Sequence, residues 1–76
     1  MFDRIKEILS EELGIAKEEI TPDANLRKNL GISSVEFVDV AMTIEEEFNI
    51  TLDEDKLRAA KTVGDLVKYL EGLTNK

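Results

Sequence analysis

The sequence predicts an all-α fold, a four-helix bundle with three long helices and one short helix. Apolar residues recur at spacings of three and four along most of the chain, which is the period of a helix with one buried face. Strand-like alternation is confined to "FNITL", a stretch too short to make a stable sheet by itself. The chain has 76 residues, of which 42% are hydrophobic and 36% charged, so we expect one small domain over residues 1–76.

The first helix is expected over Phe2–Leu13. Its apolar side chains fall on one face, and Gly14 follows at a position where helices commonly end. The residues that make this face are Phe2, Ile5, Ile8, Leu9 and Leu13.

A long segment, "IAKEEITPDANLRKNLGI", separates this helix from the next one. Loops of this length inside compact domains are uncommon unless they are ordered or functional. Thr21-Pro22-Asp23 is a turn signal, and regularly placed apolar residues anchor the segment to the core. We therefore predict an ordered loop packed across the bundle, with a helical turn near residues 26–30. The expected anchors are Ile15, Ile20, Leu26, Leu30 and Ile32.

Three further helices complete the predicted bundle. The second runs over Ser34–Phe48, and a short third helix occupies Glu54–Ala60 after the break at "NITLD". In the fourth, Thr62 and Asp65 form a plausible N-terminal capping pair. Its apolar stripe consists of Val63, Leu66, Val67, Leu70 and Leu73.

The second predicted helix has two unlike faces. Its core face consists of Phe37, Val40, Ala41, Ile44 and Phe48. The opposite face alternates apolar and acidic residues, namely Val35, Asp39, Met42 and Glu46. Isolated exposed apolar residues are common and carry no function. A row of this kind is also how a partner-docking surface is built, in which acids steer the partner and apolar groups anchor it.

Two adjacent serines precede this helix and have different expected roles. Ser33 with Glu36 matches the S-x-x-E capping box, in which hydroxyl and carboxylate each accept a backbone N–H. Ser34 falls on the first turn with its hydroxyl free, at a helix end that favours a phosphate. From these residues alone, an unmodified capping pair is the favoured interpretation.

Composition excludes several function classes. With a net charge of −7 and a pI near 4.5, the chain should be repelled by nucleic acids and anionic membranes and attracted to basic protein surfaces. It has no histidine and no cysteine, so a Ser-His-Asp hydrolase and a Cys/His metal site are both excluded. We expect no metal and no enzymatic activity. No apolar run is long enough to insert into a membrane, and we expect a cytoplasmic monomer.

The stretch "ITPDANLRKNLGISSVEFVDVAMTIEEEFNI", followed by "KTVGDLVKYL", resembles the acyl carrier protein family over nearly the whole chain. In that family a serine in a G-x-D-S-L motif carries 4′-phosphopantetheine, and the matching residue here is Ser34. Here the motif reads Ser33-Ser34-Val35, and the acid usual before L-G is Asn29. Serine can replace aspartate as a helix cap, so the helix start should be preserved.

The resemblance implies a carrier that holds acyl groups as thioesters on the Ser34 arm, for fatty-acid, lipid or polyketide biosynthesis. It implies partners with basic patches: the phosphopantetheinyl transferase, synthases and acyltransferases. These would contact Val35, Asp39, Met42, Glu46 and Glu47. The implied acyl pocket is lined by Phe37, Val40 and Ala41. Two alternatives stay open: a peptidyl or aminoacyl carrier, and an unmodified acidic bundle that only binds proteins.

Overall fold

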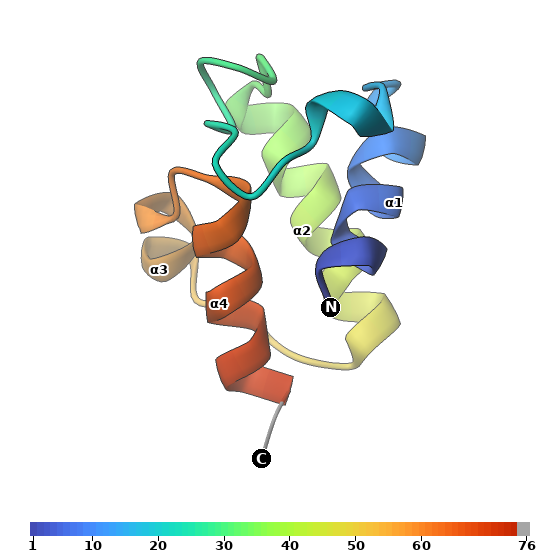
Figure 1. The fold of residues 1–76 in the computed structure, drawn as a ribbon. Coiled ribbons are helices and arrows are strands. Elements are labelled where there is room, and N and C mark those ends of the chain that lie inside the picture. Colours follow the sequence, from blue (N-terminus) through green and yellow to red (C-terminus); the bar gives the residue numbers. More distant parts are fainter. Residues whose placement is uncertain (75–76) are drawn as a thin grey trace.

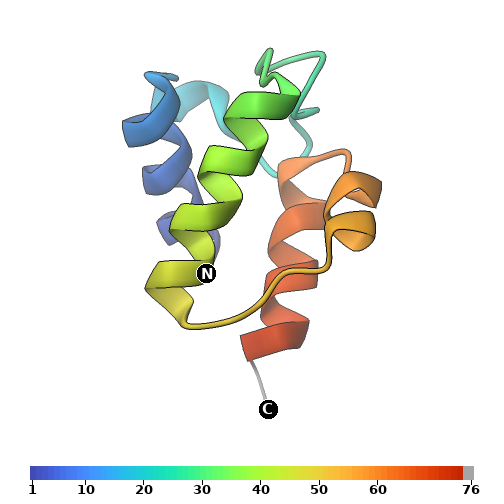
Figure 2. The same cartoon turned by 180° about the vertical axis from the view of Figure 1, so that it is seen from behind.

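A computed structural model describes residues 1–74 and confirms the all-α prediction. Three long helices, α1 (Phe2–Leu13), α2 (Ser34–Phe48) and α4 (Val63–Thr74), pack with a short helix α3 (Glu54–Ala59) (Figure 1). Seen from behind, α2 runs between α1 on one side and the α3–α4 pair on the other (Figure 2). None of the helices within residues 1–74 combines the length and the apolar character needed to cross a membrane.

The helix boundaries agree with the predicted ones to within one residue, and local end signals explain them. Gly14 ends α1 in the left-handed conformation (φ 69°), and its N–H donates to the carbonyl of Ser10 at 2.9 Å. Asn49 ends α2 in the same conformation (φ 54°). The Asp53 carboxylate caps α3 by accepting the backbone N–H groups of Asp55 and Lys56. Helix α3 ends at Ala59, one residue before the predicted end.

The core is formed by side chains from every helix and from the α1–α2 connection (residues 14–33). Its largest fully buried side chains are Ile5, Leu9, Ile20, Ile44, Leu66, Leu70, Val40 and Val63. On the predicted core face of α2, Val40, Ala41 and Ile44 are buried, while Phe37 and Phe48 are half-buried and pack against the core. The apolar stripes read from the sequence are therefore confirmed as core, except for Leu73 near the end of α4, which is half-buried outside the core cluster.

The α1–α2 connection is ordered, as predicted, and its local structure differs from the prediction in one place. Ile20, Leu26 and Ile32 are buried anchors. The predicted helical turn near 26–30 is present as a single turn, closed by the Asn29 N–H donating to the Asn25 carbonyl at 3.0 Å. A 3₁₀ helix over Lys17–Glu19 was not predicted, because it buries none of its side chains and leaves no apolar pattern.

Backbone hydrogen bonds tie this connection to the junction between α3 and α4. Leu26 N–H donates to the Lys61 carbonyl at 2.9 Å, and Val63 N–H to the Ala24 carbonyl at 3.0 Å. Gly64 N–H donates to the Pro22 carbonyl at 2.9 Å, and a Cβ at Gly64 would lie 3.0 Å from that oxygen. A residue with a side chain at position 64 would therefore have to push the Pro22 carbonyl away by a few tenths of an ångström.

The start of α4 is closed by a capping box. The Thr62 hydroxyl accepts from the Asp65 N–H at 3.1 Å, and the Asp65 carboxylate accepts from the backbone of Lys61 and Thr62, both at 3.3 Å. The predicted capping pair is therefore confirmed. These backbone N–H groups, from Lys61 first, hold the pKa of Asp65 below its ordinary value.

This cap makes the stability of the protein depend on acid pH. The folded state lowers the pKa of Asp65, so its stabilisation is present above the unfolded pKa and is lost as the pH falls through the folded value. We expect Asp65→Asn to lower the Tm at neutral pH. When the pH is lowered from about 6 to about 3, the Tm of the variant should fall by less than the Tm of the wild type. Thermal melts across that range measure the difference. The control variant Glu71→Gln removes a charge from an exposed position of α4, and its Tm should change with pH as that of the wild type does. If the Tm of Asp65→Asn also falls in parallel with that of the wild type, Asp65 is not a source of the acid dependence.

Candidate attachment site at the start of α2

The start of α2 is fixed by the predicted capping box. Ser33 has an extended backbone (φ −76°, ψ 167°), and its hydroxyl accepts from the Glu36 N–H at 3.2 Å. In return, the Glu36 carboxylate accepts from the Ser33 N–H at 3.0 Å. Gly31, in the left-handed conformation (φ 65°), leads into this turn with open space around it. The hydroxyl of Ser33 is therefore committed to the helix cap.

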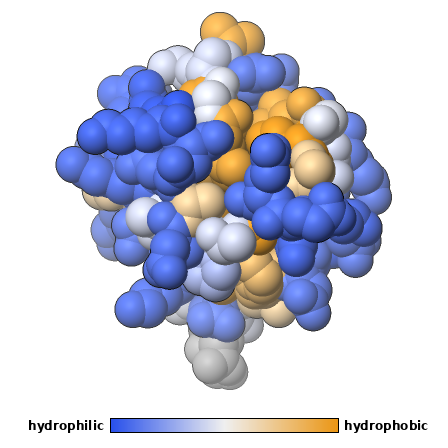
Figure 3. Space-filling view, turned by 45° about the horizontal axis from the view of Figure 1, so that its top comes forward, coloured by the Kyte–Doolittle hydropathy of each residue, from blue (hydrophilic) through white to orange (hydrophobic). Residues whose placement is uncertain are grey.

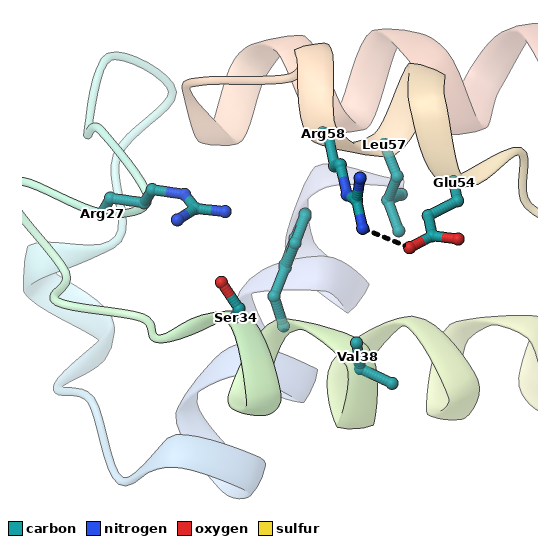
Figure 4. A pocket seen from close by; sticks show the side chains of 7 residues that line it. Arg27, Ser34, Val38, Glu54, Leu57 and Arg58 are labelled. Atoms are coloured by element: carbon teal, nitrogen blue, oxygen red, sulfur yellow. Dashed lines mark hydrogen bonds and ion pairs between the residues drawn. The ribbon is translucent and has the colours of Figure 1, made fainter.

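Ser34 is the first residue of α2, and its side chain is exposed. It lies at a cavity of about 160 Å³ between α2, α3 and the connection. Figure 4 shows its hydroxyl at the helix start, with Arg27 on one side and Arg58 on the other. The full lining of this cavity, called the Ser34 cavity, is Arg27, Ser34, Phe37, Val38, Glu54, Leu57 and Arg58.

The Ser34 cavity has an apolar wall and a cationic rim. Phe37, Val38 and Leu57 supply the apolar wall. Arg27 and Arg58 supply the cations, and Arg58 donates to Glu54 at 2.6 Å. A primary hydroxyl at the positive end of a 15-residue helix, flanked by two guanidinium groups, is suited to an ester with a phosphate. The residues present therefore fit a covalently attached, phosphate-bearing group.

The predicted acyl pocket is only partly assembled. Phe37 lines the Ser34 cavity, and Ala41 lines a neighbouring cavity of about 230 Å³ between α2 and α3. Val40 lines neither, because its side chain is fully buried (0% exposed) in the core. Val38 and Leu57 line both cavities and were missed. Val38 follows Val35 by three positions and precedes Met42 by four, a signal that could have placed it with them.

The predicted docking row is exposed on α2. Val35 is 74% exposed and Met42 54%, and Val38 between them is 56% exposed. Asp39 and Glu46 are also exposed. We call these five residues the α2 row. On the face drawn in Figure 3, which is the view of Figure 1 with the end that carries the α1–α2 connection tilted forward, apolar side chains also reach the surface between charged ones.

Glu47 differs from the rest of the predicted partner contacts. Both of its carboxylate oxygens accept from the guanidinium of Arg4 in α1. This hydrogen bonding to Arg4 lowers the pKa of Glu47. The structure therefore places Glu47 in a contact between α1 and α2, apart from the α2 row.

Comparison with known proteins agrees with this geometry. Residues 3–70 match the family described as "Phosphopantetheine attachment site". The chain is 39% identical over 71 residues to a protein named "Acyl carrier protein" from Thermotoga maritima, an alignment covering 93% of this chain and 88% of that relative. The chain therefore belongs to the phosphopantetheine attachment family, and its cofactor is a covalently attached 4′-phosphopantetheine.

Proposed function

We propose that this protein is an acyl carrier and that Ser34 bears its phosphopantetheine arm. The assignment of the arm to Ser34 is supported by one observation: of the two adjacent serine hydroxyls, one is hydrogen-bonded in the helix cap and the other is free. Ser33 accepts the Glu36 N–H within the capping box, whereas the hydroxyl of Ser34 is exposed at the mouth of a cavity. Arg27 and Arg58 beside Ser34 suit the phosphodiester that would join the arm to the protein.

The arm supplies a terminal thiol that holds acyl groups as thioesters. The chain contains no cysteine, so it provides no thiol of its own. Its residues anchor the arm at Ser34 and offer the apolar wall of the Ser34 cavity to the start of an acyl chain. We propose that the protein acts as a carrier without catalysis of its own, in fatty-acid, lipid or polyketide biosynthesis in the cytoplasm.

The α2 row is the proposed docking surface for basic patches on the transferase, the synthases and the acyltransferases. Exposed carboxylates at Asp39 and Glu46 can steer such partners, and the exposed apolar groups at Val35, Val38 and Met42 can anchor them. Glu47 joins this surface only by leaving Arg4, so it is the weakest of the proposed contacts.

Intact mass tests the function directly. The purified protein is incubated with coenzyme A and a broad-specificity phosphopantetheinyl transferase. We expect a mass gain of one phosphopantetheinyl group. An unchanged mass would favour the alternative of an unmodified acidic bundle. The cargo found on protein purified from its native cells separates an acyl carrier from a peptidyl or aminoacyl carrier.

The docking surface has its own test. We expect the double variant Val38→Ser, Met42→Ser to raise the KM of the transferase for the apo protein about tenfold, which corresponds to about 1.4 kcal/mol of binding free energy, or roughly 0.7 kcal/mol from each apolar anchor. Because both side chains are exposed, stability should change by about 0.5 kcal/mol or less. Glu71→Ser, on the exposed surface of α4, is the control and should leave the KM unchanged. An unchanged KM in the double variant would remove the α2 row from transferase recognition.

A further inference from the structure

A second cavity, of about 280 Å³, lies beside the Ser34 cavity and is lined mostly by cations. Its lining is Asn25, Arg27, Lys28, Arg58, Ala60 and Lys61, and we call it the basic pocket. The whole chain has 10 Lys and Arg against 17 Asp and Glu. Four of those ten cations line this one cavity, and no acid does. The distribution is opposite to the charge of the protein as a whole.

The cations of the basic pocket are largely uncompensated. Within residues 1–74, the ion pairs involve only Arg4 and Arg58 as cations. Arg58 pairs with Glu54 at 2.6 Å, in a contact where both side chains are mostly exposed. Arg27, Lys28 and Lys61 have no carboxylate within ion-pair distance among these residues. Four like charges around one cavity repel one another, and an anion placed among them would relieve that repulsion.

The fold holds the segments that carry these cations in place. The Asn25 side-chain oxygen accepts from the backbone of Arg27 at 2.9 Å and of Lys28 at 2.8 Å. Asn29 in turn accepts from the Asn25 N–H at 2.7 Å. The Leu26–Lys61 backbone bond then joins this turn to the other cationic segment. The backbone positions of the basic pocket are therefore set before any ligand arrives.

The basic pocket adjoins the Ser34 cavity without including Ser34. Arg27 and Arg58 line both cavities, while Lys28 and Lys61 line only the basic pocket. A phosphodiester esterified to Ser34 stays beside that residue, so it can meet the two shared arginines. The arm carries no further charge between its phosphate and its thiol. An anion that enters the basic pocket from the arm must therefore belong to the acyl group.

We propose that the basic pocket is a binding subsite for a carboxylate at the far end of the carried acyl group. This rests on the proposed function and names its substrate class: acyl groups derived from dicarboxylic acids. Exposed ion pairs are individually weak, but tethering through the arm raises the local concentration of the anion to the millimolar range. A weak subsite can then be substantially occupied.

The test compares two cargoes of equal size that differ in charge. A broad-specificity phosphopantetheinyl transferase loads the apo protein from adipoyl-coenzyme A or from adipamoyl-coenzyme A, in which a neutral amide replaces the distal carboxylate. The acylated arm is transferred to the serine hydroxyl, adenosine 3′,5′-bisphosphate is released, and intact mass verifies loading. We expect amide chemical shifts that differ between the two forms at Arg27, Lys28, Arg58 and Lys61. At 1 M sodium chloride, where the Debye length is about 3 Å, the difference should vanish.

Charge variants localise the effect. Arg27→Gln with Lys61→Gln removes two of the four cations, one from each segment, and should reduce the adipoyl-specific shifts by roughly half. Lys17→Gln with Lys68→Gln removes the same charge from exposed positions outside both cavities and should leave the shifts unchanged.

Two results would overturn the subsite. The first is an equal change at the basic pocket in the adipoyl and adipamoyl forms relative to the apo protein, which would assign the change to the phosphodiester they share. The second is an equal loss of the adipoyl-specific shifts in the control variant. If the protein gains no mass, both the proposed function and the subsite are contradicted. If the protein is loaded but shows no charge-dependent shifts, only the subsite is contradicted.

Discussion

Ser34→Ala is expected to abolish the mass gain on incubation with coenzyme A and a phosphopantetheinyl transferase. The substitution removes the hydroxyl that would form the phosphodiester and leaves the capping box between Ser33 and Glu36 intact. Because Ser34 is exposed and takes no part in that cap, the fold should persist, which a melting curve and a one-dimensional spectrum would verify. The lost mass gain would then be due to the missing Ser34 hydroxyl and not to a loss of the fold.

The adjacent serine provides the matched control. Ser33→Ala should retain the mass gain and lose about 1 kcal/mol of stability, because it removes the side-chain acceptor of the α2 cap. Ser33→Asp should retain both the mass gain and the stability of the wild type, since aspartate caps a helix equally well. A phosphopantetheinylated Ser34→Ala protein, or an unmodified Ser33→Ala protein that is still folded, would reverse the roles of the two residues.

Phe37→Ala is expected to let the protein shelter longer acyl chains, at a cost in stability. The ring is half-buried on the core side of α2 and lines the Ser34 cavity, whose volume is about 160 Å³. Removing it should enlarge that cavity toward the core. A fully buried phenylalanine loses about 3 to 5 kcal/mol on truncation to alanine, so we expect about 2 kcal/mol for this partly exposed ring.

Amide shifts of octanoyl and hexadecanoyl forms, in the wild type and in Phe37→Ala, measure the sheltering. We expect the response to chain length to extend further into the core in the variant. Phe48→Ala is the matched control, because Phe48 is also half-buried on the core side of α2 but lines neither cavity beside α3. Identical chain-length responses in the wild type and Phe37→Ala would mean that Phe37 is ordinary packing.

Periodic and local patterns in the sequence predict most of this fold. The ends of α1 and α2 follow from apolar spacing together with Gly14 and the Ser33–Glu36 box, which involve only neighbouring residues. The exposure of Val35 and Met42 follows from the same spacing. Such features depend on one helix at a time, so the sequence contains all the information that they require.

Features made by distant segments could not be predicted in this way. The basic pocket joins a turn at residues 25–28 to the α3–α4 junction, and nothing local to either segment indicates the other. The pairing of Glu47 with Arg4 depends on how α1 and α2 are placed. Val40 was expected to line the acyl pocket because it shares a helix face with Phe37. In the structure Phe37 lines the Ser34 cavity, whereas Val40, about one helical turn further along, is fully buried in the core.

The backbone bonds that hold the α1–α2 connection against the α3–α4 junction also bear on how the protein matures. These bonds join segments that are far apart in the chain, so forming them costs loop-closure entropy. That cost is offset by packing only after α4 has docked on the bundle. A nascent chain in which α1 and α2 have paired already contains Ser34 but lacks the arginine from α3 that completes its surroundings. The surroundings of the proposed attachment site are thus complete only in the finished fold, and we expect the arm to be added to mature chains in preference to incomplete ones.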